Sequence, residues 1–355
     1  MRRLVVVLAA LAVIAFSPET VLAQASKSRL NSAGATKTKA TTTKATTTKA
    51  TKTKATRSRP AAAAPVRPSE GQLAGLHRTD DPLDLKSSVA LVVNQDTNEV
   101  LFEKNPNTVL PIASITKLMT ALITVEAGLD LDEQLELDRD DQTLDRVRSR
   151  LSPGVKLTRA QALHLALMSS ENHAAQMLGR TYPGGLGAAV AAMNAKAQLL
   201  GMHDTHFADP TGLSAENRSS PADLVKLVNA AYQYPLLREY STSSELELPI
   251  GKRVVRYGST NGLTSNPDWE IGLQKTGYIS AAGRCLVMQA VIEGQRVVMV
   301  LLDSVGKYSR IGDAQRIRQW IEANKPARAG DGGLSSADQP RGRAGAAAAA
   351  SAPAV

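Results

Sequence analysis

The residues that could do chemistry lie in three short segments, SITK from Ser114, SEN from Ser170 and KTG from Lys275. Residues three apart on a helix share a face, so Lys117 can reach Ser114 Oγ if SITK begins a helix. A serine hydroxyl attacks once a neighbouring base removes its proton, and a lysine can be that base only when it is neutral. The first segment therefore predicts a nucleophile, Ser114, with Lys117 as its general base.

The other two segments supply groups that such a pair needs. A second cation, Lys275, and burial would both disfavour the charged form of Lys117. Ser170 can pass a proton between the lysines and the leaving group, and Asn172 can offer its amide to Lys117 and to the substrate backbone. Lys275 and Thr276 can also receive an anionic group of the substrate.

Backbone groups complete the predicted site. Gly277 would let a substrate strand lie close to the chain, because it has no side chain. The helix start at Ser114 offers a backbone N–H to a developing oxyanion, and we expect the Tyr278 N–H to be the second donor. The arrangement is that of an acyl-transfer enzyme.

The order of the three segments is specific, although each alone is a weak signal. Ser170 and Lys275 follow Ser114 by 56 and 161 residues. In this order the chain resembles the low-molecular-mass penicillin-binding proteins, which are serine D-alanyl-D-alanine peptidases, over residues 80–325. LPIASITKLMT, SSENHAA, FADPTGL, STNGL, KTGYI and AGRCLV also resemble that family, and most closely its soluble D-alanyl-D-alanine endopeptidase type.

The resemblance implies an α+β fold of the β-lactamase/transpeptidase type, with a five-stranded antiparallel sheet, flanking helices and an inserted helical subdomain. It also implies an acyl-enzyme on Ser114, cleavage of D-alanyl bonds in peptidoglycan cross-links, and acylation by β-lactam antibiotics. Three alternatives stay open: a D-alanyl-D-alanine carboxypeptidase, a serine β-lactamase and a non-catalytic wall-binding protein. A β-lactamase would need a deacylating glutamate, and Glu216 is the candidate besides Asp204 and Asp209.

The elements that must position these residues follow from hydrophobic patterning, turns and caps. Strands first, then helices, then strands and a last helix predict an antiparallel sheet built from both ends of the domain, with helices inserted. The expected elements are a hairpin over 88–93 and 99–102, helices over 114–127, 158–169, 187–200 and 222–232, a hairpin over 286–292 and 295–302, and a helix over 311–323.

The chain ends have a different composition. Residues 1–23 read as a secretory signal peptide, which predicts a periplasmic protein. Residues 24–75 read as a disordered Thr/Lys/Ala repeat with a Pro/Ala spacer, residues 76–325 as the catalytic domain, and 326–355 as a disordered Ala/Gly-rich tail. Of the net charge of +9, residues 24–68 hold eleven Lys and Arg and no acidic residue, so residues 69–325 carry about −4. The basic segment suits anionic envelope polymers, and export argues against nucleic acid.

From the remaining reactive side chains we expect neither a metal site nor a cofactor. The single cysteine, Cys285, excludes a disulfide framework and a Cys-rich zinc site, and we expect it to be a buried strand thiol. His203 and His206 have a spacing compatible with zinc, but no further ligands accompany them. We expect Glu171 to cap the following helix and not to act as a base.

Overall fold

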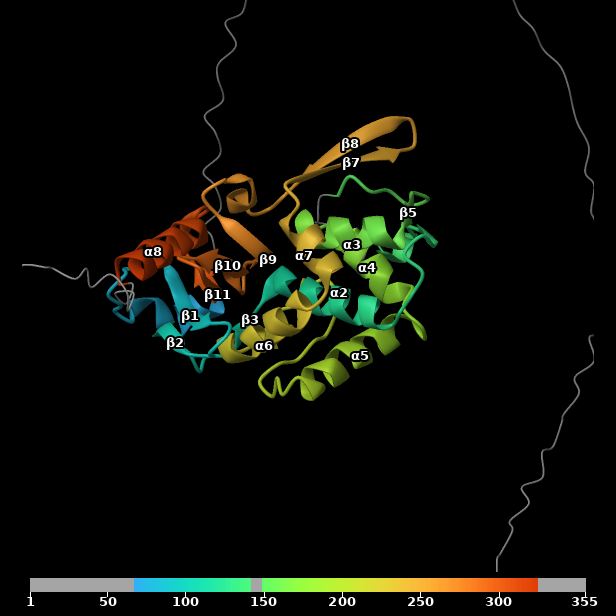
Figure 1. Ribbon diagram of the computed structural model, residues 1–355. Helices are drawn as coiled ribbons and strands as arrows, with labels where there is room; N and C mark the ends of the chain where they lie inside the picture. The colour runs from blue at the N-terminus through green and yellow to red at the C-terminus, as the bar shows by residue number, and fades with distance from the viewer. Residues whose placement is uncertain (1–66, 142–148, 325–355) are drawn as a thin grey trace, which may run out of the picture. The chain divides into compact units, whose positions relative to one another are not determined.

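A five-stranded antiparallel sheet organises the computed structural model, which describes residues 67–141 and 149–324 (Figure 1). The strand order is β2-β1-β11-β10-β9, so the first and last strands of the sequence pair in its centre, as the sequence predicted. Its strands are β1 (Ser87–Asn94), β2 (Val100–Lys104), β9 (Glu270–Ile279), β10 (Gly283–Ile292) and β11 (Gln295–Ser304).

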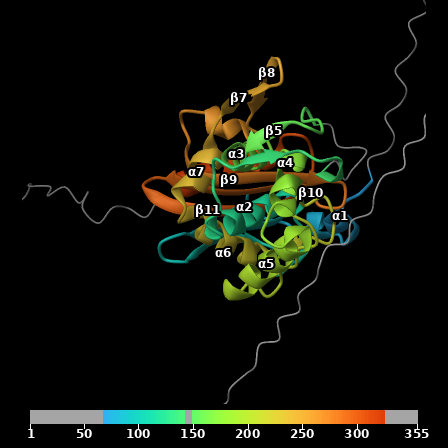
Figure 2. The same cartoon turned by 90° about the vertical axis from the view of Figure 1, so that its right-hand side faces the viewer.

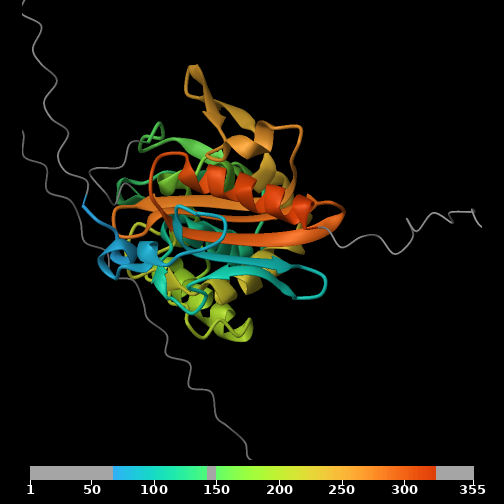
Figure 3. The same cartoon turned by 90° about the vertical axis from the view of Figure 1, so that its left-hand side faces the viewer.

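Alternating apolar side chains on the central strands build a core on each face of this sheet, because successive residues of a strand point to opposite sides. On β1, Val89 and Leu91 pack in the larger core with the inserted helices, whereas Ala90 and Val92 pack in the smaller one. The smaller core is closed by α8 (Ser309–Ala323), which lies across the sheet in Figure 3.

Helices between the N-terminal and C-terminal strands cover the other face (Figure 2). α2 is at their centre, since every side chain from Thr116 to Thr124 is buried. These helices are α2 (Thr116–Glu126), α3 (Arg159–Met168), α4 (Asn172–Arg180), α5 (Gly185–Leu199), α6 (Pro221–Tyr232) and α7 (Pro235–Thr242). The described residues also form the 3₁₀ turns η2 (Ala113–Ile115), η3 (Arg139–Asp141) and η4 (Gly262–Ser265). The same residues form three two-stranded sheets: β3 (Leu110–Pro111) with β6 (Arg218–Ser219), β4 (Gln134–Glu136) with β5 (Lys156–Thr158), and β7 (Glu245–Ile250) with β8 (Arg253–Gly258).

Local capping signals in the sequence set the helix ends where they were predicted. Thr158 Oγ1 accepts from the Gln161 N–H at 3.1 Å, and Gln161 Oε1 accepts from the Thr158 N–H at 2.9 Å, which is a complete capping box. Ser220 caps α6, with Pro221 as its first residue. Gly201 follows α5 with a φ of +70°, the left-handed conformation that a glycine after a helix provides.

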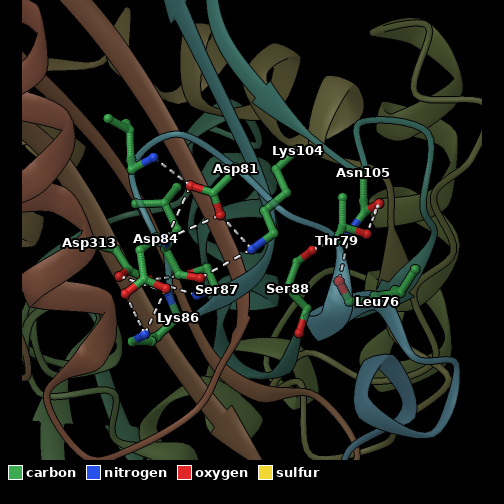
Figure 4. A network of polar contacts seen from close by, with 12 residues as sticks. Leu76, Thr79, Asp81, Asp84, Lys86, Ser87, Ser88, Lys104, Asn105 and Asp313 are labelled. Carbon is green, nitrogen blue, oxygen red and sulfur yellow. Dashed lines mark hydrogen bonds and ion pairs between the residues drawn. The ribbon is translucent and has the colours of Figure 1, made fainter.

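A buried polar network fastens the segment before β1 to the sheet (Figure 4). Lys104 donates to Asp81 at 2.7 Å, and both side chains are almost fully buried. Asn105 Nδ2 donates to the Ser88 carbonyl at 2.6 Å and to the Leu76 carbonyl at 3.1 Å. Asp313 of α8 accepts from the Lys86 N–H, the Ser87 N–H and the Ser87 hydroxyl. The network makes residues from 76 onwards an integral part of the domain.

The structured region begins before the predicted boundary at residue 76. Ser69 caps the short helix α1 (Glu70–Leu73), which η1 (Leu76–Arg78) follows, and the Glu70 N–H donates to the Ala281 carbonyl. The last residues of the segment predicted as a spacer over 24–75 thus form helical turns in the structure, because Ser69 and Gln72 make a Ser-x-x-Gln capping box. The predicted signal peptide 1–23, the repeat and the tail 326–355 lie outside the described residues.

Candidate active site

Lys117 is the point at which the first two predicted segments meet. Ser114 lies in η2, one turn before Lys117 on α2, and Asn172 is the first residue of α4. Lys117 Nζ lies 2.8 Å from Ser114 Oγ, 2.7 Å from Asn172 Oδ1 and 2.6 Å from the Thr211 carbonyl oxygen. The Lys117 side chain is fully buried, and Ser114 is 9% exposed.

These three contacts suit a neutral amine. A charged lysine would donate to all three oxygens. A neutral lysine has two N–H groups and one lone pair, and the Asn172 and Thr211 carbonyl oxygens can only accept. They would take both N–H groups, so the lone pair would be left facing the Ser114 hydroxyl.

The environment favours that neutral form. Burial lowers the pKa of Lys117 from 10.5 to about 7, although the charges of Asp209 and Glu171 oppose the change. Half of the molecules would thus hold a neutral Lys117 at neutral pH, so the side chain can act as a base there.

Lys275 is the second buried cation of the site. It lies on β9, is fully buried, and its Nζ donates to the Thr276 carbonyl at 2.9 Å. Burial, then the charge of Lys117, lowers its pKa well below 10.5. It has no carboxylate partner within the described residues, whereas the Thr276 hydroxyl is tied to Thr260 Oγ1 at 2.6 Å. An anionic ligand would therefore find an amine that has no ion-pair partner in the described part of the chain.

Ser170 and Glu171 lie at the junction between α3 and α4. Ser170 is half-buried and has a φ of +60°, which is a strained conformation for a residue other than glycine. Glu171 is the N-cap of α4, and its carboxylate accepts from the His173 N–H at 3.2 Å, so its predicted capping role is confirmed. The relay role of Ser170 stays a prediction.

Gly277 has a packing role that the sequence did not predict. A Cβ there would lie 3.0 Å from the Ile112 carbonyl oxygen, the Ala113 Cβ and the Ser114 nitrogen. Glycine is thus needed for β9 itself to approach η2, whatever a substrate strand requires. The contact brings Gly277, on the edge strand of the sheet, close to the Ser114 nitrogen.

Asp209 has a structural role that the sequence analysis did not predict. Its carboxylate accepts from the N–H groups of Thr211, Gly212 and Ser214 at 2.6, 2.7 and 2.9 Å, and from Asn217 Nδ2 at 2.6 Å. Burial opposes its ionisation, but these hydrogen bonds lower the pKa of Asp209 overall. The folded loop delivers the Thr211 carbonyl to Lys117. The D-P-T-G pattern, typical of a turn that an Asp side chain stabilises, was the available signal.

Among the described residues, the other reactive side chains form no hydrogen bond with Lys117. Glu216 and Asp204 are exposed, and both Asp209 oxygens already accept hydrogen bonds, so these three residues supply no buried, unoccupied carboxylate as a deacylating base. Cys285 is fully buried on β10, as predicted, and burial raises its pKa to about 12. Where the chain is described, no three His, Cys, Asp or Glu side chains gather as a metal site would require. None of its described helices is long and apolar enough to span a membrane.

Comparison with known sequences gives a consistent result. A sequence profile of the D-alanyl-D-alanine carboxypeptidase family, Peptidase S11, matches residues 76–306. A D-alanyl-D-alanine endopeptidase of Pseudomonas aeruginosa is 45% identical over 245 residues, which is 68% of this chain and 79% of that protein. One from Escherichia coli is 42% identical over 266 residues, or 74% of this chain and 86% of that protein.

Solved structures agree with the fold. The Streptomyces K15 DD-transpeptidase superposes with a TM-score of 0.63 at 26% identity, over 69% of this chain and 100% of that one. A D-alanyl-D-alanine carboxypeptidase from Mycobacterium tuberculosis gives a TM-score of 0.64 at 27% identity, over 70% and 95% of the two chains. The predicted fold class, a five-stranded antiparallel sheet with an inserted helical region, is thereby confirmed.

Proposed function

The chain belongs to the D-alanyl-D-alanine carboxypeptidase family of serine peptidases, and we propose that it is a D-alanyl-D-alanine endopeptidase that cuts peptidoglycan cross-links. The contact between the buried Lys117 amine and Ser114 Oγ, at 2.8 Å, is the observation that carries the catalytic assignment. The choice of endopeptidase is supported by the relatives of that name, which share 42% and 45% identity over most of their length.

The proposed reaction has two halves. Ser114 Oγ attacks the carbonyl carbon of D-alanine while its proton passes to Lys117. The oxyanion is held by the Ser114 and Tyr278 N–H groups. Ser170 then relays this proton from Lys117 to the leaving amine as the amide bond breaks, which leaves an ester on Ser114 and a neutral Lys117. A water molecule attacks this ester and gives its proton to Lys117. Lys117 returns that proton to Ser114 Oγ as the ester bond breaks, which releases the D-alanyl carboxylate and regenerates the serine.

Substrate binding is assigned to the edge of the sheet. An extended peptide can add to the free edge of β9, beside Gly277. The Lys275 amine and the Thr276 hydroxyl would receive the carboxylate next to the scissile bond, and Asn172 would bind the peptide backbone. A β-lactam carries a carboxylate and a reactive carbonyl of the same kind, so the same groups would direct it to Ser114, as in the penicillin-binding family.

Defined muropeptides test this proposal. Purified protein is incubated with a cross-linked tetrapeptide dimer and with a monomeric pentapeptide at equal concentration, and products are separated by chromatography. We expect dimers to be cut faster, at the bond from D-alanine to diaminopimelate, and Ser114→Ala to cut neither. Faster trimming of the pentapeptide would make the enzyme a carboxypeptidase. Rapid penicillin hydrolysis would identify a β-lactamase, and no turnover a binding protein.

Location and the basic segment belong to the same proposal. The signal-like residues 1–23 support export to the periplasm, and the eleven cations of residues 24–68 support retention on anionic envelope polymers. Deletion of 24–68 should preserve activity on soluble peptides and weaken binding to isolated sacculi. Binding by the full chain should fall with salt, because exposed charges are screened. Equal binding by both forms would refute the tether.

A further inference from the structure

A charged cavity lies at the end of β9, next to the catalytic cluster. It has a volume of about 410 Å³ and lies where the turn between β9 and β10 meets α1 and the end of β11. Tyr278, the residue after Gly277, forms part of its wall, and Ser280 and Gly283 continue that wall along the turn. Gly277 packs against Ser114, and the next residue, Tyr278, already lines the cavity. A ligand bound along the edge of β9 would therefore reach the cavity directly after Gly277.

Asp303 places a buried carboxyl group in the wall of this cavity. It is 1% exposed and has a φ of +53°, a strained conformation. One oxygen, Oδ2, accepts from Ser88 Oγ at 2.8 Å, whereas Oδ1 has no hydrogen-bond partner in the described part of the chain. Leaving a buried polar atom unpaired is costly, so an external partner would stabilise it.

Two glycines make room for this carboxyl group. A Cβ at Gly71 would lie 2.2 Å from Asp303 Oδ2, and one at Gly283 would lie 2.2 Å from Oδ1. Burial raises the pKa of the Asp303 carboxyl, although the neighbouring hydroxyl groups of Ser69 and Ser88 oppose the rise. Glycines on both sides thus leave space for a carboxylate that has one oxygen without a hydrogen-bond partner in the described residues.

Three cations line the same cavity, namely Arg67, Arg284 and Lys307. None of them forms an ion pair with any residue that the structure describes. The Arg284 guanidinium stacks on the exposed Tyr278 ring at 4.6 Å, which fixes its orientation at the cavity wall. An arginine held by a ring keeps its N–H groups free for a carboxylate.

We propose that this cavity binds a zwitterionic amino-acid end, with its ammonium on Asp303 and its carboxylate on Arg284 and Lys307. The inference rests on the proposed function: in a peptidoglycan stem this end is the free D-centre of the diaminopimelate that precedes the reacting D-alanine. Strand residues advance about 3.3 Å each, so the end of β9 at Ile279, where the cavity wall turns, lies roughly 7 Å from Gly277. One residue of an extended stem and three methylene groups of diaminopimelate span that distance.

Three pentapeptides that differ only at the third residue test the cavity. They carry meso-diaminopimelate, lysine, which lacks the second carboxylate, or norleucine, which lacks both charges. With two charge-assisted contacts of about tenfold each, kcat/KM should fall in that order by about 100-fold in total. N-acetylation of the free side-chain amine of diaminopimelate should cost about tenfold. Values within twofold across the series would overturn the proposal.

Variants assign the two charges within the cavity. Arg284→Gln should reduce the ratio of diaminopimelate to lysine substrate towards one, and Asp303→Asn should reduce the ratio of lysine to norleucine. Arg256→Gln, on β8 away from the cavity, is the matched control and should keep both ratios. If Asp303→Asn does not fold, the acetylated substrate still tests the ammonium site. Ratios that survive both cavity variants would refute the assignment, whereas uncut cross-linked dimers would refute only the endopeptidase.

Discussion

Acylation by a fluorescent penicillin should depend on pH through Lys117. With a pKa of about 7, one molecule in roughly eleven holds a neutral Lys117 at pH 6, half do at pH 7, and nearly all do at pH 9. The second-order rate constant should therefore rise about tenfold from pH 6 to pH 9 and level off above pH 8. A lysine with a pKa of 10.5 would instead give a rise of about 10³-fold over the same range.

The charges around Lys117 make this prediction sharper. Glu171 raises the pKa of Lys117, so Glu171→Gln should move the midpoint of the profile to lower pH, while the amide oxygen can still accept from the His173 N–H. Glu216→Gln, on the exposed part of the loop after Asp209, is the matched control and should leave the midpoint in place. Rates measured by stopped flow that keep climbing tenfold per unit to pH 10, or a midpoint that rises in Glu171→Gln, would refute the reasoning.

The same shift has a consequence for stability, and its sign follows from proton counting. Between pH 7 and 10.5 the unfolded chain binds a proton at Lys117 that the folded protein does not, so stability rises with pH in this window. The slope from this group is about 1.4 kcal/mol per pH unit, for a total of about 5 kcal/mol. Urea unfolding at pH 7 and pH 9 measures it, and a lower stability at pH 9 would contradict it.

Three further predictions concern single side chains. Ser114→Ala should abolish penicillin labelling on a gel with little change in melting temperature, since only a hydroxyl is lost; a labelled variant would place the nucleophile elsewhere. Gly212→Ala should destabilise by more than about 2 kcal/mol in urea, because its Cβ would lie 1.9 Å from a backbone oxygen, whereas Gly251→Ala, which meets nothing, should cost about 1 kcal/mol. Lys104→Met should cost about 3–5 kcal/mol by breaking a buried ion pair, against less than about 1 kcal/mol for the exposed Lys86→Met; equal effects would contradict the burial argument.

Local signals in the sequence were sufficient for much of the fold. The capping box at Thr158 marks the start of α3, and Gly201 marks the end of α5. Both signals act within one helical turn, so neighbouring residues specify these helix ends. The two hairpins are predicted from apolar runs joined by short turns, which bring neighbouring strands together locally. The long-range order of the sheet followed because these hairpins lie near the two ends of the domain.

Other elements could not be found in this way. β9 contains Gly272, Gly277 and the charged Lys275, which are residue types that weaken the strand pattern of a sequence. The structure shows that Gly277 is required because β9 packs against η2 there. The β7–β8 hairpin and α7 contain exposed or proline-marked segments with weak periodicity. The role of Thr211 could not be predicted from the sequence, because its carbonyl contacts Lys117 only in the loop conformation that Asp209 stabilises.

The pairing of β1 with β11 has a consequence for how the chain folds. Val89 lies opposite Leu302, more than two hundred residues later in the chain. During synthesis β1 can pair with β2, but its other edge must wait until the last hairpin has been made. Such non-local pairing slows folding and leaves a strand edge open to other chains in the meantime. A truncation before residue 295 should therefore remove the centre of the sheet and expose β1 to aggregation, even though Ser114, Lys117 and Lys275 would all remain.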